Sequence, residues 1–142
     1  MINICRRQVS DETVSRILSD LRYKLIVVEG IRDEDALKRL GMGHIARLNR
    51  KPVSQFAEEI ADKCGRNGVP DEIVILTDFD RKGKRLAALL RRHLERHRKH
   101  ANSMMRKAVM DLGIIHIEDI TSAGTAGLTG GRYVCQSLHQ HQ

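Results

Sequence analysis

Two carboxylates, Asp78 and Asp80, stand one residue apart just after a run of four apolar residues, 73–76. The run is mostly β-branched, which predicts a short buried strand in a parallel sheet. In open α/β sheets, ligands bind at the carboxyl ends of the strands. Two carboxylates held close together repel each other unless a cation lies between them, and hard oxygen ligands suit Mg²⁺. The pair therefore predicts a metal site, although a solvated acidic turn would have the same sequence.

A third carboxylate, Glu29, follows another buried apolar run, 25–28. If the two strands are parallel neighbours, Glu29 meets Asp78 and Asp80 at one edge of the sheet. A structural role explains one such acid easily and all three together poorly. A cluster of this kind can hold Mg²⁺, position a phosphate against it and leave one carboxylate for proton transfer.

Positive charge is concentrated directly after the Asp78–Asp80 turn. The chain has a net charge of +7, and residues 81–107 hold eleven Lys and Arg against one acid, Glu95. A solvated helix face normally carries both signs interspersed. The imbalance predicts a nucleic-acid partner bound through its phosphates, with weak sequence discrimination. An acidic protein partner and plain solubility are the alternatives, and with aromatic residues at 3% and no Trp a base-stacking platform is not expected.

The pattern of helices and strands predicts the α/β class. We expect a mainly parallel sheet of about four strands flanked by helices, with strands near 24–28, 44–48, 73–76 and 114–117. At 142 residues the chain is expected to form one domain, residues 1–122, followed by a flexible tail rich in Gly, Ser and Thr, 123–142.

The cysteines and the apolar runs bear on the cellular compartment. Three cysteines without a Cys-x-x-Cys pattern favour neither a disulfide scaffold nor a zinc ribbon. No apolar run approaches the roughly 20 residues that span a bilayer, and no signal-peptide pattern opens the sequence. We therefore expect a cytoplasmic protein without a membrane segment.

Two short motifs are similar to those of a known family. Glu29-Gly30-Ile31-Arg32-Asp33 and Asp78-Phe79-Asp80-Arg81-Lys82-Gly83 resemble the two signature motifs of the Toprim domain. Type IA and type II topoisomerases, bacterial primases, OLD-family nucleases and small nucleases that mature ribosomal RNA share this domain. The resemblance covers residues 24–118 and is closest to small stand-alone archaeal Toprim proteins and the ribosomal-RNA maturation nucleases. It implies a Toprim-like Rossmannoid fold.

The resemblance also implies roles for individual residues. Glu29 is the expected general acid/base and a further metal ligand, and Asp78 and Asp80 are the expected Mg²⁺ ligands, with Mn²⁺ as an alternative ion. Gly30 and Gly83 are expected to permit the tight turns from strand to helix. Proximity to these motifs alone nominates the phosphate and nucleic-acid contacts Arg32, Arg81, Lys82, Lys84 and Arg85.

The expected reaction is phosphodiester hydrolysis. The sequence has no room for the additional domains that topoisomerases and primases need. Tyr23 precedes its strand and Tyr133 lies in the tail, so no tyrosine is placed to attack phosphorus. Metal-activated water is then the natural nucleophile, which predicts a Mg²⁺-dependent nuclease acting on RNA or DNA. One alternative is a non-catalytic nucleic-acid-binding subunit of a larger complex; another is a haloacid dehalogenase-type phosphatase, in which Thr or Val is usual where Lys82 stands.

Overall fold

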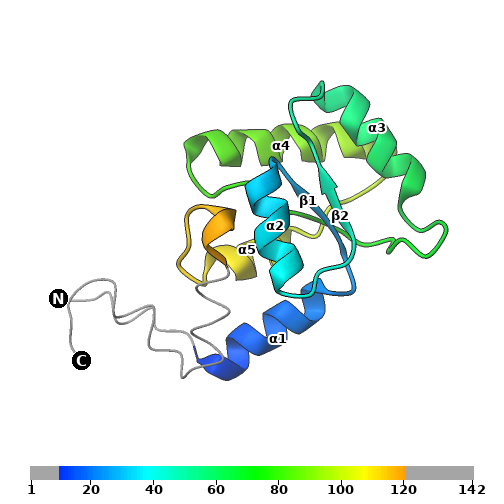
Figure 1. Ribbon diagram of the computed structural model, residues 1–142. Helices are drawn as coiled ribbons and strands as arrows, with labels where there is room; N and C mark the ends of the chain where they lie inside the picture. The colour runs from blue at the N-terminus through cyan, green and yellow to red at the C-terminus, as the bar shows by residue number, and fades with distance from the viewer. Residues whose placement is uncertain (1–9, 121–142) are drawn as a thin grey trace.

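Three short parallel strands form the centre of the molecule (Figure 1). The computed structural model describes residues 10–120, and the predicted tail, 123–142, lies outside them. The sheet has the order β2-β1-β3, in which β1 is Leu25–Val28, β2 is Ile45–Arg47 and β3 is Ile73–Ile75. The helices are α1 (Asp11–Leu21), α2 (Ile31–Arg39), α3 (Val53–Lys63), α4 (Arg81–Arg96), α5 (Ser103–Met110) and the short 3₁₀ helix η2 (Ile117–Asp119).

Helices cover both faces of the sheet, so every residue of β1 and β3 is buried. Alternate side chains, among them Ile26 and Val74, pack with α1, α2, α5 and η2. The side chains between them, among them Leu25 and Ile75, pack with α3 and α4. Figure 1 shows α3 and α4 together at the top and α1 at the bottom. Two-sided burial explains why these strands appear in the sequence as continuous apolar runs rather than alternating ones.

The predicted α/β class and parallel sheet are confirmed, but the sheet within residues 10–120 has three strands rather than about four. The segment 114–117, predicted as a strand, is irregular: it bends at Ile115 and His116, and residue 117 begins η2. Its backbone binds the loop after β3 instead of a strand: the Phe79 amide donates to the Ile115 carbonyl at 2.7 Å, and the Ile117 amide donates to Asp78 Oδ1 at 2.8 Å. Ile115 is accordingly 54% exposed.

The outer edge of β3 has its carbonyl groups satisfied from α5 and the segment before it. The Asn102 amide donates to the Ile73 carbonyl at 2.8 Å. Arg106 Nη1 donates to the carbonyls of Ile75 (3.1 Å) and Thr77 (2.9 Å), and its Nη2 donates to that of Asp78 (3.1 Å). The guanidinium also lies over the Phe79 ring, 4.6 Å from its centroid. Arg106, which the sequence assigned to the basic nucleic-acid surface, is therefore a structural residue.

No helix within the described residues, 10–120, has the length and apolar character needed to cross a membrane.

We expect Arg106→Met to lower the free energy of unfolding by about 2–4 kcal/mol, because it keeps the apolar stem but leaves three carbonyl groups without their charged donor. Chemical denaturation followed by circular dichroism measures this. Lys107→Met is the matched control: Lys107 is exposed and pairs only with Asp111 on the same helix, so a change within about 0.5 kcal/mol is expected. Equal effects of the two substitutions would contradict the structural role of Arg106.

Candidate metal and phosphate site

Asp78 and Asp80 lie where β3 ends and α4 begins. Asp80 is the N-cap of α4, and its Oδ1 accepts a hydrogen bond of 2.7 Å from the Gly83 amide. A carboxylate is favourable there because the helix dipole places positive charge at the N-terminus. Asp78 Oδ1 is held by the Ile117 amide. Each carboxylate therefore has one oxygen fixed by the backbone, while Asp78 Oδ2 and Asp80 Oδ2 both face His116.

Gly83 makes this turn possible for a steric reason. A Cβ atom at this position would overlap the backbone carbonyl of Asp78, so no other residue lets the first turn of α4 pack so closely. Buried Thr77 fixes the same contact, since its Oγ1 donates to the Gly83 carbonyl at 2.7 Å. Gly30 differs: its backbone is extended (φ −137°, ψ 179°), and a Cβ there would meet nothing within 4 Å. The absent side chain at Gly30 leaves open space beside Glu29 rather than permitting the turn.

His116 completes a set of three potential metal ligands with Asp78 and Asp80. One ligand atom from each of the three lies within 4.8 Å of the others. His116 Nδ1 is 3.3 Å from Asp78 Oδ2 and 3.9 Å from Asp80 Oδ2, and its hydrogen bond to Asp78 raises the pKa of the imidazole. Two carboxylates and an imidazole fit a divalent cation, with oxygen ligands suiting Mg²⁺ and the nitrogen adding affinity for ions such as Mn²⁺.

His116 is a candidate ligand that the sequence motifs do not predict. The available signal was its place after the apolar pair 114–115, which resembles the place of Asp78 after 73–76. The same apolar residues predict a strand at 114–117 instead. Its partners are 38 and 36 positions away, and only the folded chain brings them together.

Glu29 follows β1 and lines a pocket of about 420 Å³ together with Glu118, which stands two residues after His116. Glu29 is not one of the three clustered ligands, but Asp33, in the same pocket, connects the two groups electrostatically. Burial, followed by the negative charges of Asp78, Glu118 and Glu29, raises the pKa of Asp33 to about 6, against the opposing hydrogen bond from the Gly30 amide. The acids that follow β1 and β3 therefore act on one another as a single negatively charged region.

Asn49 and Arg50 form an unexpected wall of the Glu29 pocket. Both adopt left-handed backbone conformations, with φ of 50° and 68°, and the Asn49 amide donates to the Glu29 carbonyl at 2.9 Å. Two consecutive non-glycine residues with left-handed backbone conformations store strain, and strain of this kind clusters at functional sites. The turn brings an exposed cation, Arg50, beside Glu29.

The predicted phosphate contacts divide between the two sides of the acidic region. Arg32 is exposed in the Glu29 pocket, with its Nη1 3.8 Å from Glu118 Oε1. The other four lie exposed in the first two turns of α4, and within residues 10–120 none of them forms an ion pair: Arg81, Lys82, Lys84 and Arg85. Both ends of the site thus present cations to solvent.

A doubly covered parallel sheet with acids after neighbouring strands defines an α/β protein whose site suits a divalent ion and a phosphate. Residues 24–111 match the Toprim domain, and the chain therefore belongs to the Toprim domain family. The family predicted from the two short motifs is confirmed. Membership indicates metal-dependent chemistry on nucleic acids, with the metal bound through acidic residues.

Similar proteins come from archaea and from Aquifex aeolicus. A UPF0292 protein of Thermococcus onnurineus is 44% identical over 99 residues, which are 67% of this chain and 69% of the relative. The UPF0292 protein MJ1624 of Methanocaldococcus jannaschii is 29% identical over 112 residues, 78% of this chain and 84% of the relative. A solved structure, a putative protein from Aquifex aeolicus, shares the fold with a TM-score of 0.62 at 22% identity, covering 76% of this chain and 94% of that one. The predicted similarity to small archaeal Toprim proteins is confirmed.

We expect Asp33→Asn to raise the free energy of unfolding by about 1–2 kcal/mol at pH 7.5 in metal-free buffer. The folded-state pKa of Asp33 is raised to about 6 from an ordinary value of 3.8, so the carboxyl costs stability that builds up as pH rises from about 4 to 6 and is fully present above that range. The gain should therefore vanish near pH 4. Asparagine keeps the oxygen that accepts from the Gly30 amide. Asp35→Asn, an exposed change on the same helix, is the control; an unchanged stability of Asp33→Asn at pH 7.5 would contradict the raised pKa.

We expect His116→Ala to weaken Mn²⁺ binding about tenfold and Mg²⁺ binding less, because an imidazole adds more affinity for transition metals than for hard cations. Isothermal titration calorimetry with each ion measures this. His100→Ala removes an exposed imidazole outside the ligand set and should leave both affinities unchanged. Parent-like Mn²⁺ affinity of His116→Ala would exclude the imidazole as a ligand.

Proposed function

We propose that the protein is a nuclease that hydrolyses phosphodiester bonds of RNA or DNA with Mg²⁺ or Mn²⁺. The observation that carries the proposal is the ligand set of Asp78, Asp80 and His116 beside the pocket of Glu29. At the start of α4, directly after Asp80, stand exposed cations that form no ion pair within residues 10–120. Acids able to hold a cation, and cations able to hold phosphate, thus occupy one edge of the sheet.

Each acid has a distinct part in the proposed reaction. Asp78, Asp80 and His116 would hold the cation, which when bound supplies Lewis-acid charge to a phosphate and favours ionisation of water. Glu29 stands outside the ligand set, and its carboxylate is free to accept a proton from the attacking water and return one to the leaving oxygen. The open space beside Gly30 gives a phosphate access to that carboxylate.

The cations on either side of the acids would hold the nucleic-acid backbone. Arg81 and Lys82 lie in the first turn of α4, where the helix dipole also favours an anion. Arg32 and Arg50 are exposed on the far side, in the Glu29 pocket. A strand crossing the sheet edge would contact cations before and after the scissile phosphate, which positions the bond without selecting a sequence.

A second candidate is a non-catalytic nucleic-acid-binding subunit. It is favoured by the extension of positive charge along the whole of α4, where Arg92 and Arg96 are exposed beyond the first turns. Binding alone would explain these distant cations. Membership of the Toprim family leaves the dehalogenase-type phosphatase without support.

We expect Glu29→Gln, Asp78→Asn and Asp80→Asn each to reduce cleavage by about 100-fold or more while binding in EDTA stays within about threefold of the parent. Labelled single- and double-stranded RNA and DNA, incubated with Mg²⁺, Mn²⁺ or EDTA, measure cleavage, and fluorescence anisotropy measures binding. Asp62→Asn, an exposed change on α3, is the matched control. Parent-like cleavage by the three site variants would refute the site, whereas binding without turnover on every substrate would establish the non-catalytic alternative.

A further inference from the structure

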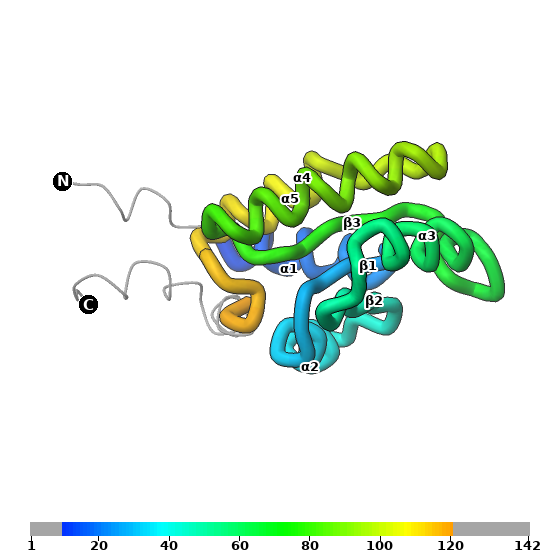
Figure 2. The backbone as a smooth tube through the Cα atoms, turned by 90° about the horizontal axis from the view of Figure 1, so that it is seen from above, coloured from blue at the N-terminus to red at the C-terminus, as the bar shows by residue number. Residues whose placement is uncertain are grey.

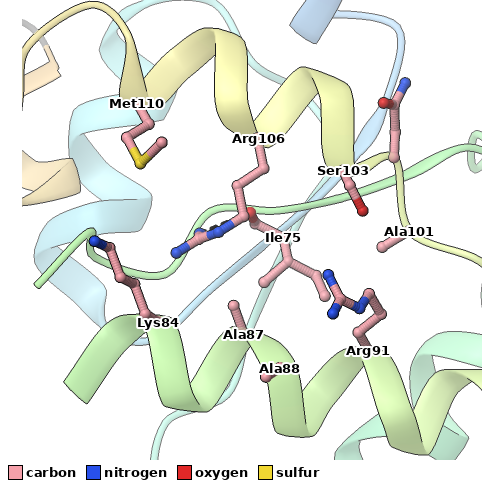
Figure 3. A pocket seen from close by; sticks show the side chains of 10 residues that line it. Ile75, Lys84, Ala87, Ala88, Arg91, Ala101, Ser103, Arg106 and Met110 are labelled. Carbon is pink, nitrogen blue, oxygen red and sulfur yellow. Dashed lines mark hydrogen bonds between the residues drawn. The ribbon is translucent and has the colours of Figure 1, made fainter. Parts of the chain in front are cut away.

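A second cavity lies at the open edge of β3, between α4 and α5 (Figure 3). Its volume is about 320 Å³, and it shares no lining residue with the Glu29 pocket. Figure 2 shows why it forms: α4 and α5 run along the same side of the molecule beside β3, although they cover opposite faces of the sheet. A groove remains where the two helical layers pass the edge of the sheet.

Small side chains keep this groove open. Ala87 and Ala88 of α4 face it where a longer residue would fill it, and Ile75 of β3 forms its floor. Ala101 and Met110 extend the apolar lining on the side of α5. The groove therefore offers a ligand an apolar surface that the protein itself leaves uncovered.

Three cations surround this apolar floor. In Figure 3, Lys84 and Arg91 reach upward from α4 and Arg106 reaches toward them from α5. The Asp and Glu residues of the chain all lie between positions 11 and 119, and none of those in this described part of the chain forms an ion pair with the three cations. The groove thus lacks a negative charge to balance its lining.

The two guanidinium groups act on each other. Burial, together with the positive charge of Arg91, lowers the pKa of Arg106 to about 10, while Asp78 opposes the shift. Arg106 is committed to the carbonyl groups of β3, so it cannot turn away from Arg91 without breaking those bonds. An anion placed beside Arg91 would relieve the repulsion.

We propose that this groove binds a nucleoside monophosphate unit, with the phosphate held at one end by Arg91 and the nucleoside on the floor of Ile75, Ala87 and Ala88. The volume is at the lower end of the range for small-molecule sites, which suits one nucleotide and excludes a duplex. A bare phosphate would leave the apolar floor uncovered, and a neutral apolar ligand would leave the cations unbalanced. The unit can be a free nucleotide or the 5′-terminal nucleotide of a strand, since both present the same groups.

The test uses the full-length protein in EDTA, so that the acidic site takes no part. Isothermal titration calorimetry with adenosine 5′-monophosphate is expected to detect binding that Arg91→Gln and Ala88→Glu each weaken about tenfold or more. Arg92→Gln removes the same charge from the adjacent, exposed position outside the groove and should change the affinity less than about twofold. Asp78→Asn should leave binding intact, which separates the groove from the proposed nuclease site.

Three results would overturn the proposal: no binding of the nucleotide at millimolar concentration, equal losses in Arg91→Gln and Arg92→Gln, or inorganic phosphate binding as tightly as the nucleotide. A 5′-phosphorylated heptanucleotide forms the second arm. Tighter binding of the heptanucleotide, still lost in Arg91→Gln, identifies the end of a strand as the ligand, and equal affinity identifies the free nucleotide. Far-ultraviolet circular dichroism confirms the folding of Ala88→Glu, and Arg91→Gln at a solvent-exposed position provides the independent variant.

Discussion

The geometry of the site depends on one guanidinium group. Arg106 donates to the carbonyls of Ile75, Thr77 and Asp78, and so fixes the end of β3 and the residues after it, where the outer edge pairs with no full strand. Edge strands otherwise expose unpaired backbone groups, and the chain beyond them is free to move. Asp78, the last of these residues, is also the first of the candidate metal ligands. Arg106 of α5 therefore positions the candidate site, although α5 is not the source of any of the three ligands.

The same region carries an electrostatic cost that a bound cation would reduce. Asp33, Asp78, Glu29 and Glu118 are close enough for the last three to raise the pKa of the first. The protein offsets part of this repulsion locally, through the N-terminus of α4 for Asp80 and the Ile117 amide for Asp78. The remaining repulsion favours a state in which positive charge is supplied from solution.

The sequence predicted the parts of this arrangement that local physics decides. The runs 25–28 and 73–76 became buried strands because two-sided burial requires uninterrupted apolar residues. Gly83 was predictable because a helix packed against the preceding turn leaves no space for Cβ. The strand predicted at 114–117 is wrong because this segment does not pair with the sheet. Its backbone instead forms hydrogen bonds to the loop that contains Asp78. Neither His116 nor Arg106 could be assigned from sequence, since their partners are distant carboxylates or backbone carbonyls that leave no pattern.

Arg106 also connects the candidate metal site with the groove between α4 and α5. Its Nη2 holds the Asp78 carbonyl at the metal-ligand site, while its side chain forms part of the lining of the groove between α4 and α5. An anion in the groove would stabilise the positive charge of this guanidinium and strengthen its hydrogen bonds to the end of β3. The backbone carbonyl of Asp78 would then be held more firmly when the groove is occupied. Such coupling needs no movement of the backbone, because one residue makes both sets of contacts.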